Sequence, residues 1–131
     1  MIALDTNALL RWIVADDAAQ HKKIVAALDL ATRKRQRVFI PEIVVVETMW
    51  TLRRSYQLTP AEAANALRQL LSASLLVMEN ETLIAQALLA YNRGRGDFSD
   101  YLIREHARAA NATPLLTFDE ALLADADFEN P

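Results

Sequence analysis

The sequence predicts an α/β domain built around a parallel sheet, and two observations carry this prediction. Short apolar runs, bounded by proline or by acidic residues, are typical of strands that are buried on both faces. Stretches of about a dozen residues with apolar side chains at helical spacing separate these runs. Such alternation indicates βαβ units, whose right-handed crossovers place helices on both faces of the sheet.

Four segments are the candidate strands. They are Met1–Leu4, Arg37–Ile40, Leu75–Met78 and Leu115–Phe118, of which Leu75–Met78 has the weakest pattern. The other three end directly at Asp5, Pro41 and Asp119. We therefore expect the chain to leave the sheet at these three positions.

The helices are predicted from spacing and from capping residues. Ala18–Thr32 has apolar residues on one face, and a second helix begins at Thr59–Glu62, where Thr caps, Pro suits the first turn and Glu follows three residues later. A third helix is expected over residues 80–91. After a loop at Asn92–Gly96, a fourth runs from Asp97 or Ser99 to Asn111.

Length and composition indicate one domain, residues 1–131. The chain is 53% hydrophobic and 24% charged, which excludes a disordered tail. It contains no cysteine, which excludes disulfides, thiolate zinc sites and iron–sulfur clusters. Because no apolar run is long enough for a membrane span and no signal peptide pattern is present, we predict a cytoplasmic protein that does not bind a membrane.

Two acidic residues stand directly after predicted strands. Ligands of open α/β sheets bind outside the carboxyl ends of the strands. If the strands before Asp5 and Asp119 are neighbours, both carboxylates lie at the same edge of the sheet. The alternative is that each Asp merely caps the helix that follows.

Glu47 lies in the segment Ile43–Trp50, which is otherwise almost wholly apolar. On a helix, no basic residue stands three or four positions away from it. A buried carboxylate is costly unless it is paired or binds a metal. The alternative is a position at the edge of the helix, open to water.

Asp97 and Asp100 stand at the start of the last predicted helix. Acidic residues in a first turn cap the helix and complement its dipole, so a structural role alone would explain them.

Taken together, Asp5, Glu47, Asp100 and Asp119 indicate a metal site. Hard carboxylate oxygens without any cysteine favour Mg²⁺ or Mn²⁺ over zinc, and a divalent cation removes the mutual repulsion of the acids. Removing these four negative charges from the net charge of −3 leaves +1, so the remaining surface does not repel a polyanion.

With these acids in place, the chain resembles PIN-domain proteins, most closely the VapC-type ribonuclease toxins of type II toxin–antitoxin systems. The segments that carry the resemblance are Leu4–Asn7, Pro41–Glu47, Gly96–Ile103 and Leu115–Asp119. Each motif is weak by itself, but their order and spacing cover nearly the whole chain.

The resemblance implies a three-layer α/β/α PIN-like fold with a central parallel sheet of four or five strands. It implies a Mg²⁺- or Mn²⁺-dependent endoribonuclease with Asp5, Glu47 and Asp100 as the acidic triad and Asp119 as a fourth, more variable acid. The family usually forms homodimers, and its toxins are held inactive by a cognate antitoxin.

Auxiliary roles follow from the same resemblance. Asp97 either shares metal binding or acts on the metal ligands, Thr6 and Asn7 orient Asp5, and Thr117 forms a hydrogen bond within the site.

An acidic cluster without a candidate nucleophile favours a metal-activated water that attacks phosphorus in line and leaves 5′-phosphate and 3′-hydroxyl ends. His21 and His106 are interpreted as structural residues rather than general bases. Arg93 and Arg95 are expected to bind the RNA backbone.

Other functions remain as alternatives. A catalytically silent PIN-fold module that binds RNA or protein would share the fold. A phosphoacceptor regulator or a haloacid-dehalogenase-like phosphatase would need a further acid near Asp5, where Thr6 and Asn7 stand.

A group of apolar residues is open to two interpretations, the core or a face that binds a partner. Its members are Leu9, Leu10, Trp12, Ile13 and Trp50.

Overall fold

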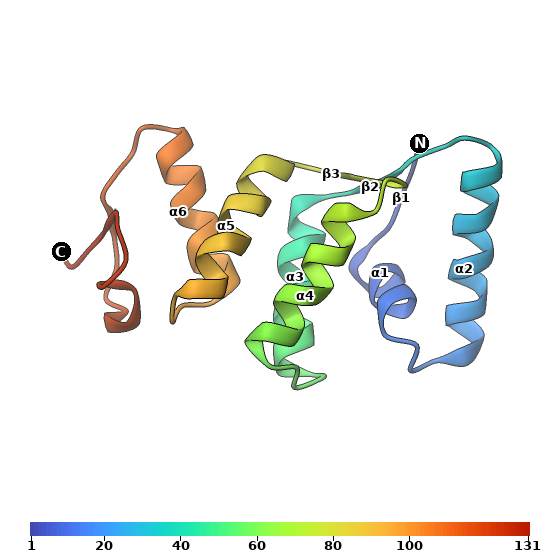
Figure 1. Cartoon of the computed structure of the whole chain (residues 1–131), viewed down its shortest axis with the longest axis horizontal. Coiled ribbons are helices and arrows are strands. Elements are labelled where there is room, and N and C mark those ends of the chain that lie inside the picture. Colours follow the sequence, from blue (N-terminus) through green and yellow to red (C-terminus); the bar gives the residue numbers. More distant parts are fainter. The chain divides into compact units, whose positions relative to one another are not determined.

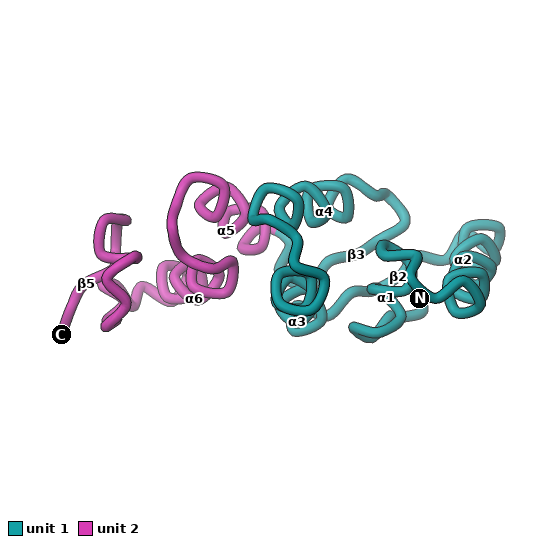
Figure 2. Tube along the Cα trace, turned by 90° about the horizontal axis from the view of Figure 1, so that it is seen from below, with its two compact units in different colours: residues 1–81 teal, residues 82–131 magenta.

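The computed structural model describes residues 1–131, which form six α-helices and five short β-strands (Figure 1). The chain divides into two compact units, Met1–Glu81 and Thr82–Pro131 (Figure 2). Each unit contains its own parallel strand pairing and its own buried residues.

The first unit contains a three-stranded parallel sheet in the order β1-β2-β3. Ile2 lies opposite Val38, and Val38 lies opposite Leu76, so β2 is the central strand. In chain order the elements are β1 (Ile2–Ala3), α1 (Thr6–Ile13), α2 (Ala18–Arg33), β2 (Val38–Ile40), α3 (Glu42–Arg54), α4 (Pro60–Ser72) and β3 (Leu76–Met78). The three strands lie within the segments that the sequence predicts.

Capping side chains mark the starts of α4 and α2. The Thr59 hydroxyl accepts a hydrogen bond from the Glu62 amide at 3.2 Å, and the Glu62 carboxylate accepts one from the Thr59 amide at 2.9 Å. This reciprocal pair confirms the predicted start of α4. Asp17 caps α2 with a single hydrogen bond, in which its carboxylate accepts from the Gln20 amide at 3.0 Å. Each such cap stabilises its helix by about 1 kcal/mol.

The core of the first unit lies between the sheet and its helices, where α1 packs against α2 and α3. Leu9 and Leu10 of α1 are buried, which confirms the core interpretation for these two residues. Trp50 differs, because 60% of it is exposed and the Arg54 guanidinium lies 5.3 Å from its ring. The apolar group named above is therefore divided between the core and the surface.

The second unit is built from two helices and a short parallel ladder. It contains α5 (Glu81–Arg93, from Thr82 onward), α6 (Phe98–Ala109), β4 (Leu115–Leu116), the 3₁₀ helix η1 (Glu120–Leu122) and β5 (Phe128–Glu129). Aromatic rings meet edge to face in its core, with centroids 6.3 Å apart for Tyr91 and Phe98 and 6.1 Å apart for Tyr101 and Phe128.

The α/β class and the parallel pairing are confirmed, but the strands are distributed differently from the expected central sheet of four or five. Three strands form one sheet and two form another. β4 pairs with β5, Leu115 opposite Phe128. The sequence pattern does not reveal β5 (Phe128–Glu129), because it lies in an acidic C-terminal tail, residues 120–131, and only Phe128 of its two residues is buried.

Candidate functional site

Asp5 stands at the carboxyl end of β1, as the sequence predicts, and it also caps α1. Its Oδ1 accepts a hydrogen bond from the Ala8 amide at 2.8 Å, and its side chain is exposed. One carboxylate oxygen is thus fixed by the backbone, while the other is available to a ligand. The capping role and a role in metal binding are compatible at this position.

Glu47 lies at the surface of α3 and is linked to α1. The Thr6 hydroxyl donates a hydrogen bond to Glu47 Oε1 at 3.1 Å, joining residues that are 41 positions apart in the chain. Glu47 is exposed. Its carboxylate is therefore not buried, and it occupies the alternative position at the edge of the helix, open to water. We expect Thr6 to orient Asp5, and its hydroxyl in fact contacts Glu47. Thr6 directly follows Asp5 in the chain, so it connects the two acids.

In the second unit, Asp97 and Asp100 face each other across the start of α6. The Asp97 amide donates to Asp100 Oδ2 at 2.8 Å, and the Asp100 amide donates to the Asp97 carbonyl at 3.1 Å. Burial raises the pKa of Asp100, the hydrogen bond from Asp97 opposes this rise, and the negative charges of Asp97 and Asp119 add to it. The ionisation of Asp100 therefore depends on the charges of two other acids of this unit, Asp97 and Asp119.

Asp119 begins η1, just after β4. Its Oδ1 accepts a hydrogen bond from the Ala121 amide at 2.9 Å, and its own amide donates to the Thr117 hydroxyl at 3.0 Å. Thr117 thus forms a hydrogen bond with one of the candidate acids. As at Asp5, one carboxylate oxygen is held by the helix start and the second is not.

The loop before Asp97 is held by Tyr101. The Tyr101 hydroxyl accepts a hydrogen bond from the Gly96 amide at 3.0 Å and donates one to Asp125 Oδ2 at 2.7 Å. A Cβ atom at Gly94 would collide with the Tyr101 hydroxyl, which explains the need for glycine there. This packing fixes the start of α6 and with it the position of Asp100.

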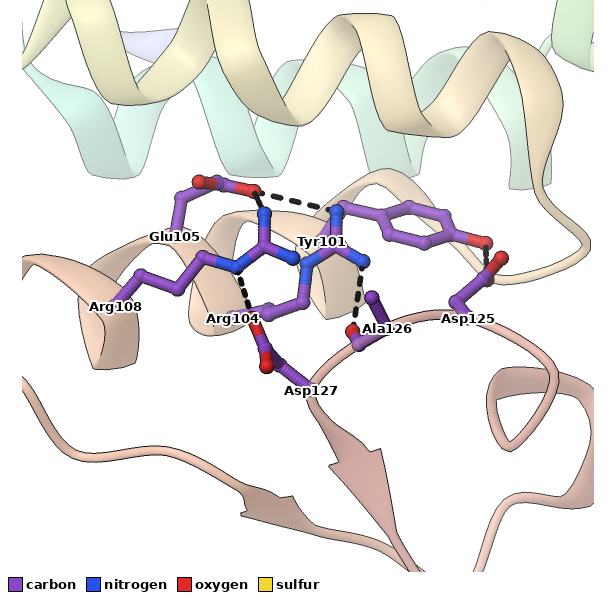
Figure 3. A network of polar contacts seen from close by, with 7 residues as sticks. All are labelled: Tyr101, Arg104, Glu105, Arg108, Asp125, Ala126 and Asp127. Carbon is purple, nitrogen blue, oxygen red and sulfur yellow. Dashed lines mark hydrogen bonds and ion pairs between the residues drawn. The ribbon is translucent and has the colours of Figure 1, made fainter.

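Further along α6, charged side chains connect the helix to the C-terminal segment (Figure 3). The Arg104 guanidinium is buried; it donates to the Ala126 carbonyl at 3.1 Å and to Glu105 Oε1 at 3.2 Å. Arg108 donates to the same Glu105 oxygen at 3.0 Å and to Asp127 Oδ2 at 2.6 Å. The acids at the start of α6 therefore stand on a helix that is held along its length.

Cations with no partner are also present in this unit. Arg93, at the end of α5, and Arg95, in the following loop, are exposed and form no hydrogen bond or ion pair. Arg93 lines a cleft of about 440 Å³ together with residues of α6. Both arginines are available to an anionic ligand, as their proposed role requires.

His21 forms a contact between two helices of the first unit. Nδ1 of His21 lies 2.8 Å from the Arg11 carbonyl oxygen and donates to it, which ties α2 to α1. This contact agrees with the structural role that the sequence analysis gives to His21.

The four main acids suit a hard divalent cation by their chemistry. None of Asp5, Glu47, Asp100 and Asp119 forms an ion pair with a basic residue, so no internal cation neutralises them. Asp5 and Glu47 belong to the first unit, and Asp100 and Asp119 to the second. Neither unit by itself gathers three acidic or histidine side chains into a group that could hold a metal.

The raised pKa of Asp100 predicts a stability effect in the absence of metal. Because the folded state disfavours the ionised carboxyl group, stability falls as the pH rises from the ordinary value of 3.8 through the raised pKa. In EDTA, we expect Asp100→Asn to have a higher melting temperature than the wild type at about pH 7, and the difference to shrink towards about pH 4. Melting curves at both pH values measure this. A variant that is less stable than the wild type at the higher pH would contradict it.

Several residues of this region escape sequence reasoning. Tyr101 and Asp125 are not predicted as a pair, although both glycines of the chain fall in the loop that Tyr101 holds. Lys23 and Gln20 line a cleft beside Asp5. Their positions at helical spacing on α2 would place them on one face, but only the packing of α2 beside α1 brings that face to Asp5.

A family profile of the PIN domain matches residues 2–129. The chain is also similar to a VapC ribonuclease of Aquifex aeolicus (strain VF5), with 23% identity over 118 residues, which cover 90% of this chain and 87% of that protein. None of the helices is long and apolar enough to cross a membrane. The profile match over nearly the whole chain shows that the protein belongs to the PIN domain family.

Proposed function

We propose that this protein is a Mg²⁺- or Mn²⁺-dependent endoribonuclease that acts as the toxin of a toxin–antitoxin pair. The observation that carries the proposal is a set of four carboxylates, at strand ends and helix starts of a PIN domain, that no basic residue neutralises. The similarity to a VapC ribonuclease supports the substrate class.

In this proposal Asp5, Glu47, Asp100 and Asp119 together bind the cation. Backbone amides hold one oxygen of three of them, and the Thr6 hydroxyl holds Glu47. This prior positioning reduces the reorganisation that metal binding requires. A divalent cation held by these four acids would lower the pKa of a water molecule and offset the charge that develops on the phosphoryl oxygens.

The remaining residues act on the substrate and on the acids. Arg93 and Arg95 bind backbone phosphates, since their guanidinium groups have no partner within the chain. Asp97 is the auxiliary acid. Its amide donates a hydrogen bond to Asp100, and its negative charge raises the pKa of Asp100. Asn7, which lines the same cleft as Asp5, orients that acid.

The partners follow from the similarity to the VapC ribonuclease. A cognate antitoxin would hold the toxin inactive in the cytoplasm, and the toxin would act as a homodimer. Exposed apolar side chains on α3, Ile43 at 67% and Trp50 at 60%, suit such a protein partner.

The direct test is cleavage of single-stranded RNA by the purified protein. We expect cleavage with Mn²⁺ or Mg²⁺, none with EDTA, and products with 5′-phosphate and 3′-hydroxyl ends. End-specific ligation and phosphatase treatment of the products identify these ends. Cleavage that continues in EDTA, or products with 2′,3′-cyclic phosphates, would overturn the mechanism. Binding of RNA without cleavage would instead favour the catalytically silent PIN-fold module.

A further inference from the structure

A cleft of about 310 Å³ lies between α1 and α2 of the first unit, next to Asp5. Its volume is at the lower end of the range for sites that bind small ligands. Its walls are formed by Asp5, Asn7, Ala8 and Arg11 of α1 and by Gln20, Lys23 and Ile24 of α2. A ligand group in this cleft would therefore be adjacent to a candidate metal ligand.

The Arg11 side of the cleft is rigidly built. Arg11 Nε donates to Gln20 Oε1 at 2.6 Å, and Arg11 Nη1 donates to Asp16 Oδ1 at 3.2 Å and to the Tyr56 hydroxyl at 3.3 Å. The Tyr56 hydroxyl donates in turn to Asp16 Oδ2 at 2.9 Å. Because these contacts already engage Arg11, its guanidinium group is held in place at the edge of the cleft. Its positive charge is partly balanced by Asp16.

Lys23 supplies the charge that has no partner. It is exposed and forms no hydrogen bond or ion pair, although it lines the same cleft as Asp5 and Asn7. An ammonium group offers three donors and a compact charge, which suit a phosphate. The side-chain amide of Asn7 is also exposed and can donate to the same ligand.

The charged and apolar side chains of the cleft favour an anionic ligand that also has apolar carbon groups. Since Arg11 is paired with Asp16, Lys23 supplies the unpaired positive charge beside Asp5, and a cation bound at Asp5 would remove the repulsion of an anion. Ala8 and Ile24 provide apolar surface between the polar groups. A nucleotide, with its phosphate and its sugar carbons, combines these properties.

We propose that this cleft binds an RNA backbone phosphate beside the scissile bond and that Lys23 contacts this phosphate. The assignment rests on the proposed nuclease function, because that function places the scissile bond near Asp5. It names a substrate-binding residue in the first unit, in addition to Arg93 and Arg95 of the second.

The test compares Lys23→Ala with Lys22→Ala in the full chain. Lys22 is the adjacent exposed lysine of α2 and does not line the cleft, so the two variants lose the same charge one position apart. Affinity for a fluorescent single-stranded RNA is measured by anisotropy in EDTA over a range of salt concentrations, and KM and kcat are measured with Mn²⁺.

We expect Lys23→Ala to weaken RNA binding and to raise KM about tenfold, with kcat changed less than about twofold, because the contact holds the substrate before and during reaction. The slope of log affinity against log salt should fall by about 0.7, the value for one phosphate contact of a single strand. Lys22→Ala should stay within about twofold of the wild type, and Lys23→Arg should restore most of the affinity, since it keeps a phosphate donor.

Equal effects of Lys22→Ala and Lys23→Ala, or no effect of Lys23→Ala, would overturn the assignment of the cleft. The binding measurement needs no catalysis, so the two proposals can fail separately. Cleavage by the wild type without a specific effect at Lys23 would overturn only the cleft. A specific effect at Lys23 on binding by a protein that does not cleave RNA would overturn the nuclease, and with it the scissile bond, and would leave Lys23 as a residue that binds RNA.

Discussion

Asp100→Asn should lower the rate of Mn²⁺-dependent RNA cleavage on the order of 10²–10³-fold, corresponding to roughly 3–4 kcal/mol of transition-state stabilisation. The amide keeps the shape of the side chain and can still accept the hydrogen bond from the Asp97 amide. It removes the negative charge that a divalent cation requires. Initial rates on a labelled RNA measure the loss, and growth of cells after induction gives a second readout, which the variant should no longer arrest.

The matched control is Asp29→Asn, which removes the same charge from an exposed position of α2. It should cleave RNA at the rate of the wild type. The double variant Asp5→Asn/Asp100→Asn tests whether acids of both units serve one site. If they do, the double variant should be little worse than either single variant, because residues that act as a unit are not additive. Losses that multiply would indicate two separate sites and would contradict the shared metal site.

Mn²⁺ should raise the melting temperature of the wild type on the order of 10 °C when it is present at about one hundred times its dissociation constant. At this ratio a ligand that binds only the folded state stabilises it by about 2.7 kcal/mol, and for a chain of this size each kcal/mol shifts the melting temperature by several degrees. Thermal melting with Mn²⁺ and with EDTA measures the shift. Relief of the repulsion between Asp100 and its acidic neighbours is the physical source of part of this gain.

The same variants separate specific binding from a general effect of the ion. Asp5→Asn and Asp100→Asn should each lose most of the Mn²⁺-dependent rise, while Asp29→Asn should keep it. Ca²⁺ at equal concentration controls for ionic strength and charge. An equal rise in the wild type and in both site variants would show that the cation binds elsewhere.

Much of the fold can be predicted from residues that are close together in the chain. The start of α4 follows from Thr59, Pro60 and Glu62, whose hydrogen bonds span three residues. Two strands of the first sheet, β1 and β2, follow from short apolar runs that end at Asp5 and Pro41. Capping and periodicity are local properties, so the sequence expresses them directly.

The environment of the acids could not be predicted in the same way. Apolar neighbours of Glu47 suggested burial, but α3 turns this residue outward, towards the Thr6 hydroxyl. The contact joins two helices, and its existence depends on how both pack against the sheet. Similarly, the pairing of β4 with β5 depends on a tail that has little strand pattern of its own.

By itself, the sequence determined the α/β class, the start of α4, the positions of the acids at strand ends and helix starts, and the membership of the PIN family. The tertiary structure alone decided that Thr6 holds Glu47, that Tyr101 holds the loop before Asp100, and that Lys23 shares a cleft with Asp5. The physical reason is the range of the interactions. Propensity and capping act within a few residues, whereas these contacts arise only when packed helices bring distant side chains together.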